Sequence, residues 1–595
     1  MLRFVVPAVF ALAAAASAQT RFLPLKDVRA GMRGVGRTVF TGNQIDEFQV
    51  EILGVLDNIG PKQSLILARL SGGPLEHTGV MQGMSGSPVY IDGKLVGAVA
   101  MAFPFSKDPI AGIRPIEEML KVGSAGGGAV QRARAQERMP GKPISVGDRD
   151  LTRVFAKQEA LPAGESRLIN IATPISFGGF TRTTLDAFAP QLRSLGLEPL
   201  QSVTGGAEIA PRMGNPADLK PGAMISVQLM AGDLSVGADG TVTYIDGNRI
   251  YAFGHRFLAV GSTAIPFARS EVVTLLPNVN TSFKLSVAKE WMGTINEDRD
   301  TALAGELGRR PPMAPVSIVV SRNGREIDSY HMQMIDDPLL SPLLTQMAVF
   351  SAIDATERSV GAASIRVNGQ IEFQNAPAPV RLDNIFSADN GAAAQVSLSA
   401  AVPVAYVLQS SFASLRLKNV SLRVEALDQK KALTIDSVMA SRRQVRPGEK
   451  LRVDVVLSGE NGTETSRSVE YDVPLGAPEG PLYITVSDAN TANLSDFRQV
   501  LTGTVHSTDE LIAAVNNLHP NNKIYVRFWR ADPAFQLEGA ELPNPPASVA
   551  MILFNSQANV AGITQVRNSK VAEMEIDAGD VAVSGAKTIV AEVKE

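Results

Sequence analysis

Short runs of alternating apolar residues, separated by glycine-containing turns, recur along most of this chain. Residues 49–56 and 64–70 are two such runs. Alternation with a period of two places the apolar side chains on one face of a strand. The dipeptides Asp239-Gly240 and Asp246-Gly247 follow apolar runs, and such pairs favour tight hairpin turns. The sequence therefore predicts a mainly β protein.

One strand–turn–strand pattern occurs twice. Residues 90–99 read YIDGKLVGAV and residues 244–253 read YIDGNRIYAF. Two related barrels would produce such a repeat. A chance similarity between two β-hairpins is the alternative.

The last third of the chain is also rich in strand patterns. Residues 451–458 alternate between apolar and mostly polar side chains, which is typical of a half-buried strand in a β-sandwich. Ser507 and Glu510 form a capping box ahead of an apolar stripe at 511, 512, 515 and 518. We expect one helix there.

Charge and composition exclude several classes of function. Lys and Arg number 56 against 60 for Asp and Glu, a net charge of −4, so the chain lacks the basic excess that a nucleic-acid partner requires. There are 0 cysteines, which excludes disulfides and thiolate chemistry. The 5 histidines show no i, i+4 pair of the zinc-binding kind. We expect no metal and no cofactor.

The first residues resemble a secretion signal. Arg3 precedes an apolar run from residue 4 to 15, and Ala16-Ser17-Ala18 is typical of a cleavage site. Later in the chain no apolar stretch reaches the roughly 20 residues that a membrane-spanning helix needs. We therefore expect export to the periplasm or the extracellular space and, after cleavage, no transmembrane segment.

The segment from Gly79 to Tyr90 carries the strongest chemical signal. Ser85 stands in Gly83-Met84-Ser85-Gly86, and the glycines permit a tight turn that exposes the hydroxyl. The same turn points the backbone N–H groups of Gly83, Met84 and Ser85 into one concavity, where they can bind an oxyanion. A glycine-rich turn without chemistry is the alternative.

A serine nucleophile needs a base within hydrogen-bond reach. Two histidines compete for this role. His77 lies eight residues before Ser85, and an extended chain would place it well away from the hydroxyl. His255 follows the second hairpin and lies next to Gly254. A buried histidine with a structural role is the alternative for His255.

Several motifs together resemble the SpoIVB-type peptidases of family S55, which are trypsin-like serine endopeptidases of bacterial sporulation. The residues that carry the resemblance are QGMSGSP at 82–88, DGKLVGAV at 92–99, Asp108-Pro109, the IEEML segment at 116–120 and the FGH sequence ending at His255. The resemblance implies a double β-barrel in which Ser85 is the nucleophile and His255 the general base.

This chain departs from the family pattern in two ways. The serine half comes before the histidine half, which implies a circularly permuted order. The family also carries an aspartate in the strand before the serine motif, where this chain has Leu70 and no carboxylate. Three acidic residues near His255 in sequence could substitute, namely Asp233, Asp246 and Glu271.

The expected organisation is therefore a mainly β chain with a permuted trypsin-like double barrel followed by β-sandwich-like modules. Its parts are a signal peptide (1–18), a serine-half barrel (19–122), a linker (123–143), a histidine-half barrel region (144–345), a sandwich-like module (346–475) and a small module with one helix (482–595).

Three hypotheses for function follow. The first is an exported serine endopeptidase acting on a protein or peptide. The second is a non-catalytic scaffold that binds an envelope protein or a glycan, and the missing acid motivates it. The third is an enzyme inhibited by its own chain and processed at Arg132, Arg134 or Arg138 in the linker.

Overall fold

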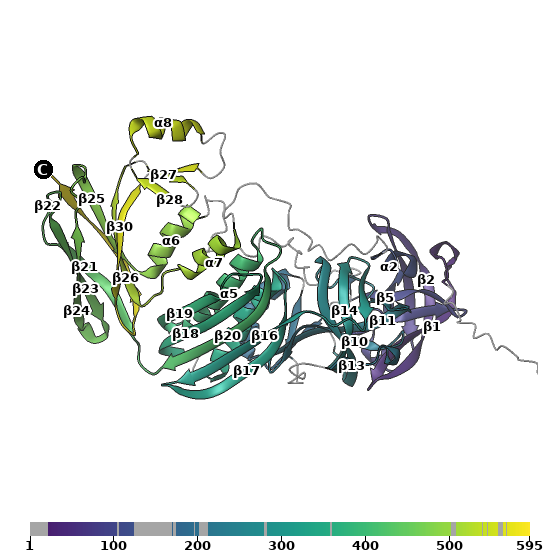
Figure 1. Cartoon of the computed structure of the whole chain (residues 1–595). Helices are drawn as coiled ribbons and strands as arrows, with labels where there is room; N and C mark the ends of the chain where they lie inside the picture. Colours follow the sequence, from purple (N-terminus) through teal and green to yellow (C-terminus); the bar gives the residue numbers. More distant parts are fainter. Residues whose placement is uncertain are drawn as a thin grey trace, which may run out of the picture.

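The computed structural model places most of the chain in β-sheets (Figure 1). It describes residues 22–103, 106, 108–123, 169–170, 174–195, 197–201, 212–278, 282–356, 360–500, 507–532, 534–537, 540–543, 545–556, 563–566 and 568–594. The predicted signal peptide, the linker beyond residue 123 and its three arginines lie outside these ranges. None of the described helices is long and apolar enough to cross a membrane.

The N-terminal part is a closed barrel. Its strands pair in the order β4-β1-β2-β3-β6-β5, and β4 also pairs with β5, which closes the ring. Phe48, Ile66 and Val99 are among its buried core residues. The elements of this part are β1 (Arg33–Thr41), β2 (Gln44–Gly60), β3 (Gln63–Ser71), α1 (Leu75–Thr78), β4 (Pro88–Ile91), β5 (Lys94–Ala102), β6 (Ile110–Pro115), α2 (Ile116–Met119) and β7 (Ile169–Asn170), preceded by a short 3-10 helix (Leu25–Asp27).

A second ring follows within a sheet of 13 strands. Its strands pair in the order β10-β13-β14-β15-β12-β11, and β10 also pairs with β11. They are β10 (Met224–Gly232), β11 (Ser235–Asp246), β12 (Arg249–Ala252), β13 (Gly261–Leu276), β14 (Phe283–Arg299) and β15 (Ala302–Leu307), preceded by a 3-10 helix (Pro216–Asp218). The mainly β fold rich in barrels is thus confirmed.

The long β13–β14 hairpin joins the two rings. Gly42, just past β1, pairs with Val272 of β13, and Gln82 pairs with Phe283 of β14. The far end of this hairpin therefore lies against the residues that precede Ser85. Figure 1 shows the two barrels side by side at one end of the molecule.

The repeated pattern forms a hairpin in each ring. The first hairpin joins β4 to β5 through Asp92 and Gly93, whose φ values are 49° and 73°. The second joins β11 to β12 around Gly247, whose φ is 58°.

The hairpin expected at Asp239-Gly240 is wrong, because both residues lie inside β11. Ser286 donates to the Asp239 carboxylate at 2.7 Å, which satisfies this acid within the sheet. A Cβ at Gly240 would lie 2.3 Å from the Phe253 ring, so the glycine is needed for packing rather than for a turn.

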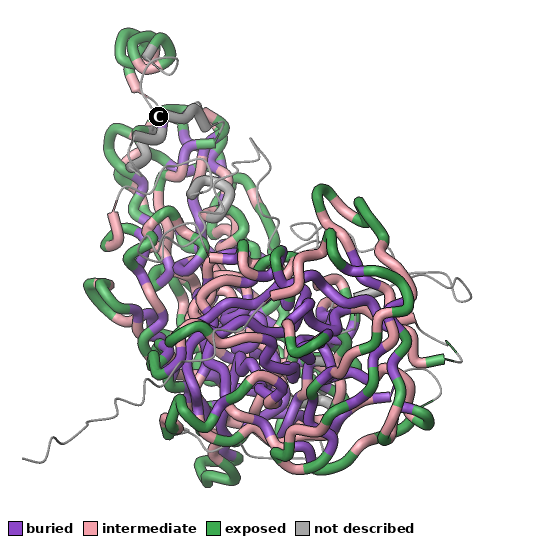
Figure 2. Tube along the Cα trace, turned by 90° about the vertical axis from the view of Figure 1, so that its right-hand side faces the viewer, coloured by how far each residue is buried: buried purple, intermediate pink, exposed green. Residues whose placement is uncertain are grey.

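The 13-stranded sheet continues beyond the second ring and is covered by helices. At one end are β8 (Pro174–Gly178), α3 (Arg182–Ser194) and β9 (Glu198–Gln201). At the other end are β16 (Met313–Arg322), β17 (Arg325–Ile335), α4 (Leu340–Thr356), β18 (Val360–Gln374), β19 (Val380–Asn390), α5 (Ala392–Leu408) and β20 (Arg416–Leu427). This region and the second ring share one large buried core. Figure 2 shows that buried residues gather in the interior of the trace and exposed residues at its outer loops.

The remaining strands form a β-sandwich with its own core. One sheet pairs in the order β24-β23-β21-β31 and the other in the order β22-β32-β25-β26-β30. The strands are β21 (Ala432–Ala440), β22 (Gln444–Val445), β23 (Lys450–Gly459), β24 (Glu464–Asp472), β25 (Gly480–Ser487), β26 (Lys523–Arg530), β30 (Ser569–Asp577), β31 (Ala582–Ser584) and β32 (Ala586–Val593), with a 3-10 helix (Glu460–Gly462) between β23 and β24. The sandwich thus combines strands that come before residues 475–482 in the sequence with strands that come after them.

Three helices and a small sheet accompany the sandwich. They are α6 (Ala489–Val500), α7 (Thr508–Asn516), α8 (Ala547–Ser556) and the strands β27 (Ala534–Leu537), β28 (Ala540–Pro543) and β29 (Ile563–Val566). Helix α7 begins as its capping box predicts, since the Ser507 hydroxyl accepts from the Glu510 N–H at 3.1 Å. Helices α6 and α8 were not predicted.

Candidate active site

Ser85 lies on a tight turn that leads into β4. The flanking Gly83 and Gly86 have φ values of 91° and 93°, which side chains rarely adopt. Two hydrogen bonds hold the turn, from the Gly86 N–H to the Val99 carbonyl at 2.7 Å and from the Ser87 N–H to the Met84 carbonyl at 2.9 Å. The local sequence therefore fixes the turn because only glycine tolerates these two positions.

The N–H groups of this turn differ in whether they donate a hydrogen bond within the protein. Met84 donates to the Met81 carbonyl at 3.2 Å, so its N–H is committed inside the turn. The N–H groups of Gly83 and Ser85 have no acceptor among the described residues. Of the three N–H groups expected to bind an oxyanion, those of Gly83 and Ser85 are therefore available for a ligand in this structure.

Strand β11 of the second ring holds the turn from outside. The Thr241 N–H donates to the Ser85 carbonyl at 2.8 Å, and the Thr241 hydroxyl donates to the Gly83 carbonyl at 2.9 Å. The Thr243 hydroxyl donates to the Gly86 carbonyl at 2.7 Å. The carbonyls of Gly83, Ser85 and Gly86 thus all bond to the second barrel, which fixes the turn against β11.

Two glycines bring the serine and histidine segments together. A Cβ on Gly86 would lie 2.5 Å from the Phe253 nitrogen, and a Cβ on Gly254 would lie 3.4 Å from the Val99 carbonyl oxygen. That same Val99 carbonyl accepts the Gly86 N–H. The residue after Ser85 and the residue before His255 therefore pack against one point of β5.

The His255 ring has a defined tautomer. Its Nδ1 lies 2.7 Å from the Arg256 carbonyl oxygen, which can only accept, so Nδ1 carries the proton and Nε2 carries the lone pair. Nε2 is buried and has no hydrogen-bond partner among the residues that the structure describes. This is the tautomer that a general base requires.

The surroundings of His255 disfavour its charged form. The pKa of His255 is lowered to about 4, chiefly by burial and also by the charges of Arg114 and Arg256, against the hydrogen bond to the Arg256 carbonyl, which raises it. Arg114 is itself buried, forms an ion pair with Glu118 at 3.1 Å and donates from Nε to the Gly254 carbonyl at 3.4 Å. His255 is therefore neutral at neutral pH.

Of the three acids considered as partners of His255, two are engaged elsewhere and the third is exposed. Glu271 pairs with Arg269 at 2.7 Å. Asp233 accepts from the His331 N–H at 2.6 Å. Asp246 is an exposed residue at the end of β11.

Asp298 supports the histidine segment instead. It accepts from the N–H groups of Phe257 and Leu258 at 2.9 and 2.7 Å and fixes the loop that follows His255. Burial raises the pKa of Asp298, against these backbone hydrogen bonds. No direct contact to the imidazole is found within the described part of the chain.

The site is closed. Ser85 and His255 each expose 1% of their surface, and His255 Nε2 is not hydrogen-bonded to the Ser85 hydroxyl. Such hydrogen bonds are often long in proteins without substrate, so their absence does not remove the chemistry. A peptide must nevertheless displace part of the chain to reach Ser85.

Sequence reasoning missed the residues that support this arrangement. Thr241, Arg114 and Asp298 belong to strands distant in sequence from the groups they contact. No motif marks them, because a threonine inside a strand and charged residues near strand ends are ordinary. Only the pairing of the two barrels identifies their roles.

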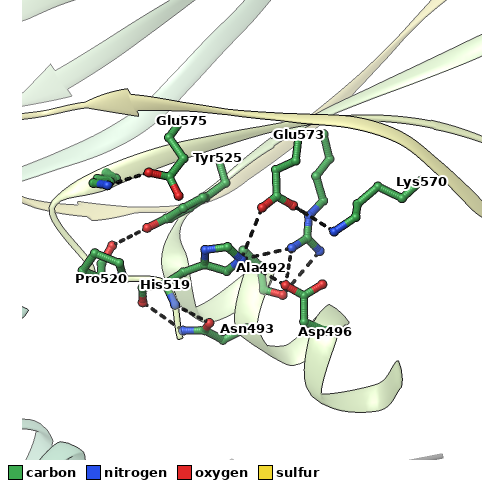
Figure 3. A network of polar contacts seen from close by, with 11 residues as sticks. Ala492, Asn493, Asp496, His519, Pro520, Tyr525, Lys570, Glu573 and Glu575 are labelled. Carbon is green, nitrogen blue, oxygen red and sulfur yellow. Dashed lines mark hydrogen bonds and ion pairs between the residues drawn. The ribbon is translucent and has the colours of Figure 1, made fainter. Parts of the chain in front are cut away.

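A second polar cluster lies in the sandwich (Figure 3). Asp496 of α6, His519 and Glu573 of β30 place their ligand atoms within 4.8 Å of one another, as a metal site would. Arg527 of β26 donates to Asp496 at 2.6 Å and also to Glu573, and Lys570 lies 3.6 Å from Glu573, so two cationic side chains already pair with the two carboxylates. Burial alone would raise the pKa of Asp496, but bonds from His519 and Arg527 lower it. The cluster is a satisfied ion-pair network rather than a metal centre.

Comparison with known proteins identifies the N-terminal part. No curated protein matches the chain. The family model described as SpoIVB peptidase S55 matches residues 16–120, a range that includes the first barrel and Ser85. The match suggests a serine peptidase of the SpoIVB kind. Over residues 16–120, this chain is thus recognised as a SpoIVB peptidase S55 domain.

Proposed function

We propose that this protein is an exported serine endopeptidase of the S55 type, with Ser85 as nucleophile and His255 as general base. Its substrate is a protein or peptide of the cell envelope or its surroundings. The observation that carries the proposal is the His255 tautomer. Nδ1 is tied to a carbonyl, and the lone pair on Nε2 has no competing partner among the described residues.

The chemistry follows from these groups. The Ser85 oxygen attacks a peptide carbonyl, and its proton passes to His255 Nε2. The N–H groups of Gly83 and Ser85 hold the resulting oxyanion. Collapse of the intermediate breaks the C–N bond, and His255 returns the proton to the leaving amine. Water, activated by His255, then releases the acyl group from Ser85.

The reversed order of the two halves is compatible with this proposal. Catalytic triads are defined by geometry and not by chain order. The contacts of Thr241 and Thr243 with the turn support a single site made by both barrels. Whether the order reflects a permutation is a separate question of ancestry.

The alternative function is a non-catalytic envelope scaffold that binds a protein or glycan. The burial of Ser85 and His255, each 1% exposed, favours this alternative, as does the lack of a carboxylate on the imidazole in the described structure. The two functions differ in whether Ser85 reacts.

A fluorophosphonate probe tests the choice, because it reports an activated serine without knowledge of the substrate. We expect labelling of the full chain at Ser85 and its loss in Ser85→Ala and His255→Ala. Ser87→Ala is the matched control, since Ser87 is a buried neighbour with only a long contact to Thr241 at 3.5 Å. Labelling that persists in Ser85→Ala would contradict the assignment, and no labelling of the folded wild type would favour the scaffold.

A further inference from the structure

Lys284, near the start of β14, is a buried lysine that forms no ion pair with the described residues. It exposes 4% of its surface. Within the described structure, no carboxylate lies at ion-pair distance from its amine. Instead, Nζ donates to the Thr38 hydroxyl at 2.7 Å and lies 5.8 Å from the centre of the Phe40 ring. A lysine held by neutral groups in a protein interior is costly to charge.

The side chain of Lys284 lies directly against the nucleophile turn. Its Cδ and Cγ atoms lie 3.1 and 3.3 Å from the point where Gly83 would carry a Cβ. Its backbone N–H donates to the Gln82 carbonyl at 3.2 Å, and the Gln82 N–H donates to the Ser282 carbonyl at 2.9 Å. One residue therefore touches the turn through both its backbone and its stem.

The amine extends the same contact to the first barrel. Thr38 lies in β1, whereas Lys284 belongs to β14 of the second ring. Lys284 thus connects β14, the turn that carries Ser85, and β1. Movement of the turn away from β14 would break these contacts and expose the lysine to water.

We propose that Lys284 is a positioning residue that latches the nucleophile turn closed, and that the turn opens by releasing this side chain into solvent. The proposal deepens the proposed function, because it names the contact that keeps Ser85 buried. The latch itself is a property of the fold and exists whether or not Ser85 reacts.

Two acidic groups face Lys284 from neighbouring strands. They are Asp239 of β11 and Asp46 of β2, and both raise the lysine pKa through their charge. Burial outweighs them and lowers the pKa of Lys284 to about 7 from 10.5. Asp239 accepts a bond from Ser286, and burial raises its own pKa.

The latch must therefore respond to pH. An opened turn hydrates Lys284, which then binds a proton up to a pH near 10.5, whereas the closed turn binds it only below about 7. Between these values the open form binds more protons, so opening becomes about tenfold rarer for each unit of rising pH. Below pH 7 both forms are protonated and the dependence disappears.

Amide hydrogen exchange measured by mass spectrometry tests this on the full chain. The readout is protection of a peptide covering residues 79–90, corrected for intrinsic exchange, at several pH values from 6 to 9. We expect wild-type protection to be level below pH 7 and to rise towards tenfold per unit above it. In Lys284→Met, which keeps an unbranched stem but cannot titrate, protection should not vary with pH.

Two further variants define the titrating group. Lys289→Met is the matched control, because Lys289 lies on the same strand but is 41% exposed and pairs with Glu271 at 3.4 Å. It should retain the wild-type pH profile. Asp239→Asn removes a charge that raises the lysine pKa, so the break in the profile should move to lower pH. This variant also keeps the test informative if Lys284→Met fails to fold.

Failure of the latch and failure of the proposed function give different results. Protection of residues 79–90 that does not depend on pH in the wild type, or a pH profile unchanged in Lys284→Met, overturns the latch even if Ser85 is labelled. A pH-dependent latch in a protein whose Ser85 is never labelled supports the latch and contradicts the peptidase. If both hold, fluorophosphonate labelling should slow as the pH rises above 7 in the wild type only.

Discussion

The imidazole of His255 donates its Nδ1 proton to the carbonyl oxygen of the next residue, Arg256, at 2.7 Å. In serine peptidase triads a carboxylate occupies this place, where it fixes the tautomer and stabilises the imidazolium. A carbonyl achieves the first effect and only weakly the second, because it carries no full charge. His255 is therefore a base whose proton is on the correct nitrogen but whose charged form receives little stabilisation.

The pH dependence of serine reactivity follows from this contact. The pKa of His255 is lowered to about 4, chiefly by burial, so its base form persists well below the usual 6.5. We expect the rate of fluorophosphonate labelling to show no fall between pH 6.5 and 5 and to drop near pH 4. A decline centred near 6.5 would show that His255 is solvated in the reactive state.

The same shift affects stability. Between pH 6.5 and 4 the unfolded chain binds a proton at His255 that the folded chain does not, so stability falls as the pH falls through this window. In His255→Gln this contribution is absent. Thermal unfolding of both proteins at pH 6.5 and 4.5 should show a larger loss for the wild type, and equal losses would contradict the buried, neutral histidine.

Substitution of Gly86 tests the junction of the two barrels. Gly86→Ala places a Cβ 2.0 Å from the Thr241 carbonyl oxygen, and the residue has a φ of 93°. Backbone strain and overpacking together should cost about 3 kcal/mol. Gly93→Ala is the control, because its φ is 73° but nothing lies within 4 Å, and it should cost about 1 kcal/mol. Denaturant unfolding measures the difference, and similar values would mean that the clash is relieved.

Arg114 links the stability of the first barrel to the charge near His255. Arg114→Met leaves Glu118 buried without its ion pair, which should cost about 3–5 kcal/mol. Addition of Glu118→Gln should recover much of this loss, since the amide oxygen still accepts from the Ser64 N–H. Both variants should raise the pKa of His255, because they remove a nearby positive charge. If the fall in the labelling rate at acidic pH does not move to higher pH in these variants, this prediction is contradicted.

The sandwich cluster should not respond to metals. Arg527 and Lys570 together pair with Asp496 and Glu573, so neither zinc nor a chelator should change the thermal unfolding temperature of the wild type. Arg527→Met removes the shared guanidinium from both carboxylates and should destabilise the protein by about 3 kcal/mol. Stabilisation of the wild type by zinc at micromolar concentration would identify the cluster as a metal site after all.

The sequence predicted the parts of this fold that depend on local chemistry. The turn around Ser85 needs glycines with positive φ, and its motif shows them directly. The cap at Ser507 was predicted for the same reason, because a capping box is written in four consecutive residues.

Features that depend on long-range contacts could not be predicted. Asp239-Gly240 has the composition of a hairpin turn, yet Phe253 packs on the glycine and Ser286 satisfies the acid, so tertiary contacts override the local preference. The partner of His255 is a backbone carbonyl, and no side-chain motif can indicate a group that every residue possesses. The role of Lys284 likewise depends on a strand that reaches across from the second barrel.

The pairing of Gln82 with Phe283 also has a consequence for the order of events during synthesis of the chain. During synthesis, the nucleophile segment emerges long before the strand that supports it. A nascent or truncated chain that ends between residues 90 and 281 has Ser85 but lacks β14 and the backbone groups that bond to Gln82. If it ends ahead of residue 241, it also lacks Thr241. If Ser85 is the nucleophile, as we propose, its reactivity is withheld until the second barrel is complete, which protects the cell that makes the protein from a prematurely active fragment.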